Sequence, residues 1–122
     1  MLGGLESRVC HPCAKKAAKA GFDWPSADGA SAKVREELAE ALEAAKTKNR
    51  EQTEEELGDL LFSVVNLCRH LKVEPSVALR KTNGKFVKRF KYMEKKMKET
   101  GQEMRAENLD VMDGFWDEAK KG

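Results

Sequence analysis

Two pairs of acidic residues in the centre of this 122-residue sequence have the spacing of neighbours on a helix face. Glu37 and Glu40 are three residues apart, and Glu56 and Asp59 repeat that spacing farther along the chain. Side chains three residues apart on an α-helix lie next to each other. Carboxylate oxygens in this number suit Mg²⁺ or Mn²⁺. The spacing therefore makes these four carboxylates candidate metal ligands.

The segment between the two pairs determines whether they meet. A short polar stretch, KTKNRE, separates two helical patterns and favours an antiparallel hairpin. The hairpin would fold about Lys48. Glu40 and Glu56 then lie level with each other, eight residues before and after it, and Glu37 and Asp59 are level too, eleven residues before and after it. Four carboxylates at one height repel one another unless cations neutralise them. The sequence therefore predicts a Mg²⁺ site, with Mn²⁺ as the alternative ion.

Other metal chemistries fit the sequence less well. A single pair of glutamates at this spacing is usually solvated surface, but two pairs matched in level favour a site. A di-iron carboxylate bundle needs a histidine three residues after a glutamate, and neither His11 nor His70 has that spacing. The stretch CHPC, with Cys10 and Cys13, lacks the second ligand pair that structural zinc requires. We interpret it as part of a first helix.

The second acidic pair lies in a stretch that is apolar on nearly every side of a helix, EEELGDLLFSVVNLCRHL. A narrow polar seam interrupts the apolar surface, formed by Glu56, Asp59, Ser63, Asn66 and His70. A helix this apolar is normally buried, and buried carboxylates are costly unless they are compensated. A metal site explains the seam, and the remaining apolar surface predicts a homo-oligomer, because five modest helices cannot cover every side.

Helical periodicity extends through most of the chain. It predicts helices over residues 6–20, 32–45, 54–71 and 75–99, followed by a short last helix that Asn108 caps. The Gly-, Pro- and Ser-containing stretch 21–31 is predicted to be a loop, and Pro75 suits a first helical turn. No strand-like alternation is present. The expected fold is all-α: a single domain over residues 1–122, built as an antiparallel bundle of about five helices and completed by oligomerisation.

Composition narrows the classes of function. Charged residues make up 36% of the chain, hydrophobic residues 40%, and the net charge is only +2. No membrane span or signal peptide is evident, and three cysteines form no disulfide framework, so we expect a cytoplasmic protein without a membrane partner. The basic stretch from Arg80 to Lys98 gives the alternative function, a nucleic-acid-binding helical module. Acidic residues elsewhere nearly cancel this charge, which makes a nucleic-acid partner the weaker hypothesis.

The acidic motifs resemble those of the MazG family of nucleoside triphosphate pyrophosphohydrolases. The family pattern of E-E-x-x-E followed by E-x-x-D reads here as EELAE and ELGD. The stretches GFDWP, KTNGKFVKRF and FWDEAK also resemble the family, most closely the C-terminal module of the two-module bacterial protein. We expect this sequence to be either a short form of this protein or a fragment that holds one module, and Gln52 stands where a basic nucleotide contact is expected.

The resemblance implies Mg²⁺-dependent hydrolysis of a nucleoside triphosphate to the monophosphate and pyrophosphate, in a dimer or a dimer of dimers. It implies that the four carboxylates bind the metal, and that Glu36 or Glu37 activates the attacking water. The implied substrate contacts are Lys33, Glu36, Lys85, Arg89 and Trp116. The spacing supports two of these, because Lys85 and Arg89 are four residues apart and can point at one phosphate chain.

Overall fold

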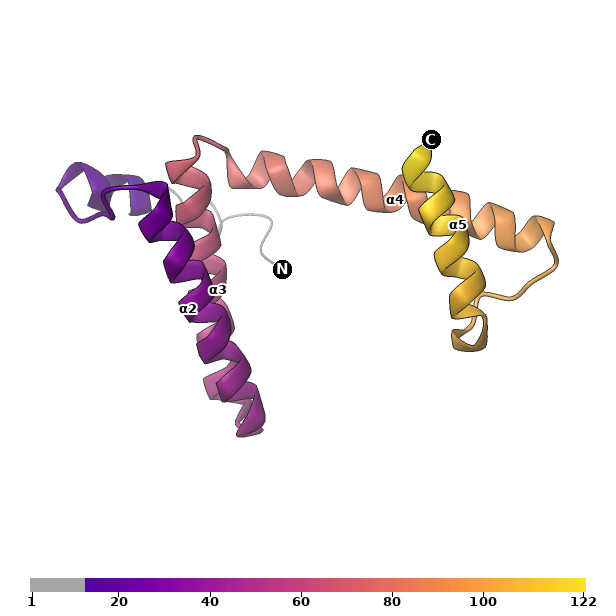
Figure 1. Ribbon diagram of the computed structural model, residues 1–122, viewed down its shortest axis with the longest axis horizontal. Coiled ribbons are helices and arrows are strands. Elements are labelled where there is room, and N and C mark those ends of the chain that lie inside the picture. The colour runs from indigo at the N-terminus through magenta and orange to yellow at the C-terminus, as the bar shows by residue number, and fades with distance from the viewer. Residues whose placement is uncertain (1–12) are drawn as a thin grey trace. The chain divides into compact units, whose positions relative to one another are not determined.

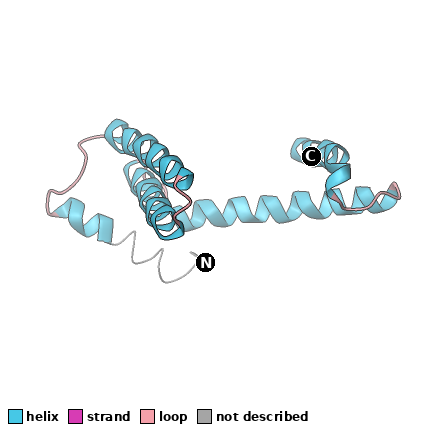
Figure 2. Cartoon of the chain, turned by 90° about the horizontal axis from the view of Figure 1, so that it is seen from below, coloured by secondary structure: helices cyan, strands magenta, loops and turns pink. Residues whose placement is uncertain are grey.

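The computed structural model describes residues 13–122, and no β-strand occurs among them (Figures 1 and 2). Residues 13–19 are helical. The further elements are α2 (Ala27–Lys46), α3 (Arg50–His70), α4 (Pro75–Glu99), the short 3₁₀ helix η1 (Ala106–Asn108) and α5 (Leu109–Lys121). The all-α prediction is confirmed for this part of the chain. Of the CHPC stretch, only Cys13 belongs to the described residues, and it is exposed.

Contacts divide the chain into two compact units, Met1–Ala78 and Leu79–Gly122. The first contains α2 and α3, and the second contains most of α4 together with η1 and α5. No helix among the described residues combines the length and the apolar character that crossing a membrane requires.

Helices α2 and α3 begin earlier than their periodicity predicts. α2 begins at Ala27 rather than at residue 32. The backbone of Ser26, at the N-cap position, is extended, and the helix that follows includes Gly29. The side chain of Trp24 covers Gly29 so closely that a Cβ there would lie 3.2 Å from it. α3 begins at Arg50 rather than at residue 54, because the Asn49 side chain accepts a hydrogen bond from the backbone N–H of Gln52. This is the side-chain cap that a helix N-terminus requires.

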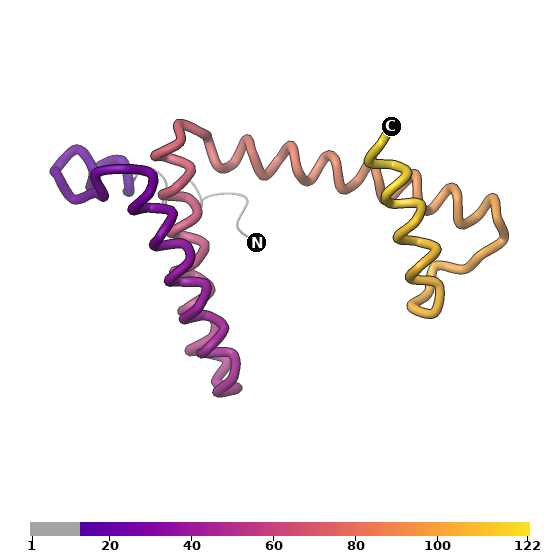
Figure 3. The backbone as a smooth tube through the Cα atoms, viewed as in Figure 1, coloured from indigo at the N-terminus to yellow at the C-terminus, as the bar shows by residue number. Residues whose placement is uncertain are grey.

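α2 and α3 form the predicted antiparallel hairpin and lie side by side in both views (Figures 1 and 2). The tube in Figure 3 follows the tight connection between them. Lys48 takes a left-handed conformation there, with φ of 59°. The hydroxyl of Thr53 on α3 donates to the carbonyl of Ala44 on α2, at 3.3 Å. The hairpin is therefore tied by backbone geometry and hydrogen bonds at its closed end.

The interface inside the hairpin is made of small and polar side chains. The buried residues are Ala30, Glu37, Ala41 and Ala44 on α2, and Ser63 and Asn66 on α3. Many of the larger apolar residues of both helices remain exposed within the single chain, namely Leu38, Leu42, Leu57, Leu61, Phe62 and Val64, while others such as Leu60 and Leu67 are half-buried. The sequence predicts that one chain cannot cover every side of α3, and these residues are exposed within the single chain, where small side chains let the helices meet through the polar seam.

The second unit is built on the C-terminal part of α4. This helix begins at Pro75 and ends at Glu99, as predicted. Gly101 follows in the left-handed conformation, with φ of 71°, and the backbone N–H of Gln102 bonds to the carbonyl of Met97 at 2.9 Å. This bond is typical of a helix that ends on glycine. Met93 and Met97 are buried, whereas Phe86, nearer the N-terminus of α4, is exposed.

The last helix is joined to α4 by two side-chain contacts. The rings of Phe86 and Trp116 have centroids 5.2 Å apart, and the Tyr92 hydroxyl donates to a carboxylate oxygen of Glu118 at 2.5 Å. Asn108 stands at the N-cap position of α5, but its side chain makes no capping bond. It donates instead to the carbonyl of Glu103 at 2.8 Å. The predicted cap is therefore wrong in its chemistry, although its position is right.

Candidate metal centre

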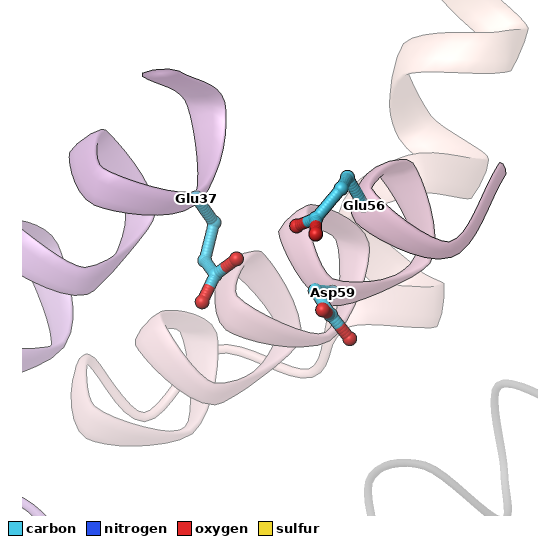
Figure 4. Close-up of side chains that lie close together, drawn as sticks. All are labelled: Glu37, Glu56 and Asp59. Atoms are coloured by element: carbon cyan, nitrogen blue, oxygen red, sulfur yellow. The ribbon is translucent and has the colours of Figure 1, made fainter. Parts of the chain in front are cut away.

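Three carboxylates from the two hairpin helices converge (Figure 4). α2 provides Glu37, and α3 provides Glu56 and Asp59. One carboxylate oxygen from each residue lies within 4.8 Å of the corresponding oxygens of the other two. Glu37 is buried, Glu56 is half-buried and Asp59 is exposed. The group is thus enclosed on the α2 side and open at Asp59, where waters or substrate oxygens have access.

Two oxygens in this group lack any protein partner. Oε2 of Glu37 and Oε2 of Glu56 are buried and make no hydrogen bond. An unpaired buried carboxylate oxygen is costly, and buried charges are normally paired or bound to metal. A divalent cation with hard oxygen ligands removes this cost, and Mg²⁺ commonly binds through a few carboxylates while keeping several waters. The residues present therefore fit such an ion.

Lys33 balances part of the negative charge. Its Nζ lies 3.1 Å from Oε1 of Glu37 and 3.3 Å from Oε2 of Glu36. The hydrogen bond to Glu37, followed by that to Glu36, raises the pKa of Lys33 above its ordinary value. The structure thus brings Lys33 and Glu36 to the centre. Both residues were predicted there from the resemblance alone, although their helical spacing also indicates these ion pairs.

Glu40, the fourth predicted ligand, is not one of the three converging residues. It is exposed on α2, and the charge of Glu37 raises its pKa, with smaller contributions from burial and from Glu56. Burial raises the pKa of Glu56, and the charges of Asp59 and Glu37 add to this effect. The four carboxylates therefore influence one another electrostatically, as their matched spacing predicts, while three of them approach within ligand distance.

A cavity of about 430 Å³ adjoins the centre, shares Glu56 with it and is also lined by Glu40. Its further lining residues are Ala39, Glu43, Ala44, Thr47 and Gln52. The amide oxygen of Gln52 accepts a hydrogen bond from the Thr47 hydroxyl at 3.4 Å. Gln52, the departure from the expected basic residue, thus stands in the wall of a cavity next to the carboxylates.

The cationic candidates lie in the second unit. Lys85 is exposed and Arg89 half-buried on α4, and Trp116 on α5 contacts Phe86. Asn83 on α4 is exposed. All of these residues belong to the unit Leu79–Gly122, whereas the carboxylates belong to the unit Met1–Ala78. Their contact with a substrate stays a prediction.

Known proteins resemble the chain over most of its length. Residues 27–98 match the MazG nucleotide pyrophosphohydrolase domain. The nucleoside triphosphate pyrophosphohydrolase/pyrophosphatase MazG of Thermotoga maritima is 44% identical over 108 residues, which are 88% of this chain. The nucleoside triphosphate pyrophosphohydrolase of Escherichia coli K12 is 39% identical over 109 residues. An uncharacterized protein of Bacillus subtilis, YabN, is 48% identical over 66 residues, which are 54% of this chain.

The match covers a part of these relatives. The chain spans 41% of the length of the Thermotoga maritima and Escherichia coli proteins, and 14% of the Bacillus subtilis protein. The matched domain includes both acidic motifs, from Glu37 to Asp59, and most of the basic helix α4. By this match and by the convergence of its carboxylates, the chain belongs to the MazG nucleotide pyrophosphohydrolase domain family.

Proposed function

We propose that this chain hydrolyses nucleoside triphosphates to the monophosphate and pyrophosphate, with Mg²⁺ held by the hairpin carboxylates. The observation that carries the proposal is the pair of buried, unpartnered oxygens on Glu37 and Glu56, which lie on opposite helices of the hairpin. The relatives named for this activity support the choice of reaction. The function of the acidic motifs is then to bind the metal on which the triphosphate is held.

The residues around the centre have distinct roles in this proposal. Glu37, Glu56 and Asp59 hold the ion, with Glu40 beside them, and bound Mg²⁺ supplies positive charge that offsets the charge of the triphosphate. Lys33 pairs with one oxygen of Glu37, and the other oxygen, which has no hydrogen-bond partner, would be available to the ion. Glu36 is more exposed, so its carboxylate is accessible to accept a proton from the attacking water. Glu37 is the alternative catalytic base.

Two cations of α4, in the second unit, are the proposed phosphate contacts. Lys85 and Arg89 stand one helical turn apart and offer a point charge and a bidentate donor to phosphate oxygens. These contacts stabilise the negative charge that develops on the departing pyrophosphate. Trp116 provides a flat apolar surface for contact with the nucleotide.

Product analysis tests the reaction directly. Incubation of the protein with a panel of nucleoside triphosphates and Mg²⁺ is expected to yield monophosphate and pyrophosphate in equal amounts, separated by ion-exchange chromatography. Excess chelator is expected to abolish turnover, because the carboxylates alone cannot offset the charge of the triphosphate. Orthophosphate as the first product, or full activity in chelator, would refute the proposal.

Removing one carboxylate should separate stability from activity. Because the pKa of Glu56 is raised above its ordinary value of 4.5, the folded state holds this proton more tightly than the unfolded state does. Its contribution to stability is therefore greatest below pH 4.5 and falls as pH rises through 4.5 towards the raised value. We expect metal-free Glu56→Gln to unfold at a higher temperature than wild type at pH 7, and to lose this advantage near pH 4.

The same variant should be inactive. Residues that orient a metal ligand typically change metal affinity or activity about 10–100-fold, so loss of a ligand itself is expected to lower kcat/KM at least about a hundredfold. The variant should also be stabilised less by Mg²⁺ against thermal unfolding. Glu54→Gln on the same helix, whose side chain is exposed, is the matched control and should behave as wild type does. Near-full activity of Glu56→Gln at saturating Mg²⁺ would contradict the metal assignment.

The exposed apolar residues of the hairpin support a homo-oligomer, either a dimer or a dimer of dimers. Leu42 and Leu61 are 59% and 48% exposed within the single chain, and apolar surface on both helices is more stable when a second copy covers it. We expect sedimentation velocity at micromolar concentration to give at least a dimer. Leu42→Lys together with Leu61→Lys should shift the population to monomer, and a monomeric wild type would contradict this proposal.

Two substitutions on α4 distinguish a phosphate site from a nucleic-acid surface. Arg89→Ala removes charge-assisted hydrogen bonds worth roughly 1.5–3 kcal/mol, which corresponds to about a tenfold or greater loss of kcat/KM. Lys95→Ala, on the same helix and exposed, should change it little. A nucleic-acid-binding module would instead lose oligonucleotide affinity in similar steps for both variants, with a flatter salt dependence. Equal losses of oligonucleotide affinity in both variants, without phosphate release from nucleotides by wild type, would favour the nucleic-acid-binding module.

A further inference from the structure

A second polar cluster lies in the first unit, at the open end of the hairpin. Asp23, in the loop that precedes α2, meets Arg69 and His70 in the last turn of α3. Oδ1 of Asp23 lies 2.5 Å from Nη2 of Arg69 and 2.9 Å from Nε2 of His70. The side chains of Arg69 and His70 are largely buried, whereas Asp23 belongs to an exposed loop and its side chain is 22% exposed. This contact joins parts of the chain that are 46 and 47 residues apart.

Neighbouring groups hold both sides of this contact in place. The amide oxygen of Asn66, which is buried, accepts hydrogen bonds from Nε and Nη2 of Arg69 at 3.1 and 2.9 Å. On the loop side, the backbone N–H of Trp24 donates to Oδ1 of Asp23 at 2.8 Å. The hydrogen bond from Arg69 lowers the pKa of Asp23, with smaller contributions from His70 and Trp24. We refer to Asp23, Asn66, Arg69 and His70 as the Asp23 clamp.

The Asp23 clamp and the metal centre use the same face of α3. The polar seam of this helix runs through Glu56, Asp59, Ser63, Asn66 and His70. Its first two residues belong to the metal centre and its last two belong to the clamp. Between them, Ser63 is buried and bonds to the backbone of its own helix. One rigid helical face therefore connects the two clusters.

The clamp opposes the force that the carboxylates generate. Like charges on Glu37, Glu56 and Asp59 push α2 and α3 apart when no cation is bound. The interface offers little apolar surface against this force, because its buried side chains are small or polar. The turn at Lys48 ties one end of the hairpin, and the clamp ties the other through charge-assisted bonds. The carboxylates lie between these two fixed ends.

We propose that Asp23 is a positioning residue for the metal centre, which sets the separation of α2 and α3 and thereby the affinity for the divalent ion. The proposal rests on the metal centre of the proposed function. Asp23 does not contact the ion; it acts through Arg69 and His70 on the helix that carries Glu56 and Asp59. Residues that orient metal ligands from outside typically change metal affinity 10–100-fold.

Mn²⁺ binding without nucleotide tests this role. Electron paramagnetic resonance of free Mn²⁺ gives the dissociation constant for wild type and for Asp23→Ala and Asp23→Asn. We expect Asp23→Ala to bind roughly tenfold more weakly. Asp23→Asn should lie between, because its amide oxygen still accepts a hydrogen bond but carries no charge. Asp28→Ala, in the exposed first turn of α2, is the matched control and should bind as wild type does.

The stability of each variant is measured beside its affinity by urea unfolding followed by circular dichroism. A clamp that only stabilises the fold would lower the unfolding midpoint and leave the Mn²⁺ dissociation constant of the folded variant unchanged, and this result would overturn the proposal. If Asp23→Ala does not fold, the same comparison on Asp23→Asn decides. A wild type that binds no Mn²⁺ would refute the metal centre itself, and with it this role of Asp23. Equal Mn²⁺ binding by wild type and Asp23→Ala would refute the role of Asp23 alone.

Discussion

The repulsion among Glu37, Glu56 and Asp59 is the constraint on which the rest of the hairpin depends. Their oxygens lie within 4.8 Å of one another, and two oxygens are buried without a partner. Helices that carry such a group separate unless other contacts hold them. The small side chains of the interface let the backbones come close, but they bury little apolar surface. Contacts at the two ends of the helices oppose this separation, and in the proposed function a bound cation would add to them.

This use of the inner face explains why the larger apolar residues point outwards. An amphipathic helix normally directs its apolar stripe to the neighbouring helix. In this hairpin the neighbour occupies the polar seam, so Leu38 on α2 and Leu57 on α3 remain exposed in the single chain. Covering them would stabilise the hairpin without disturbing the carboxylates. The proposed metal centre and the proposed association therefore use different side chains of the hairpin.

The sequence predicts the local parts of this arrangement and misses the long-range ones. Three-residue spacing and a short connection leave the hairpin little freedom, so the meeting of Glu37 with Glu56 and Asp59 could be predicted. Counting residues about Lys48 cannot resolve which carboxylates reach ligand distance, and Glu40 falls outside the close group. The earlier helix starts depend on Asn49 and on the packing of Trp24 against Gly29. The contact between Asp23 and Arg69 joins residues 46 apart, and no local pattern indicates it.

The charges around the centre indicate why a divalent ion suits it better than a further lysine would. When ionised, Glu37, Glu56 and Asp59 carry three negative charges, and Lys33 lies beside only one of them. Lys33 binds one oxygen of Glu37 and leaves the other buried without a partner, as is Oε2 of Glu56. A second lysine would offset one more charge and would require a long side chain inside the narrow interface. A divalent cation offsets the two remaining charges with a single small ion and accepts oxygens from both helices at once. In the proposed function, a bound divalent ion would therefore bring these three carboxylates and Lys33 closest to neutrality and would join the two helices.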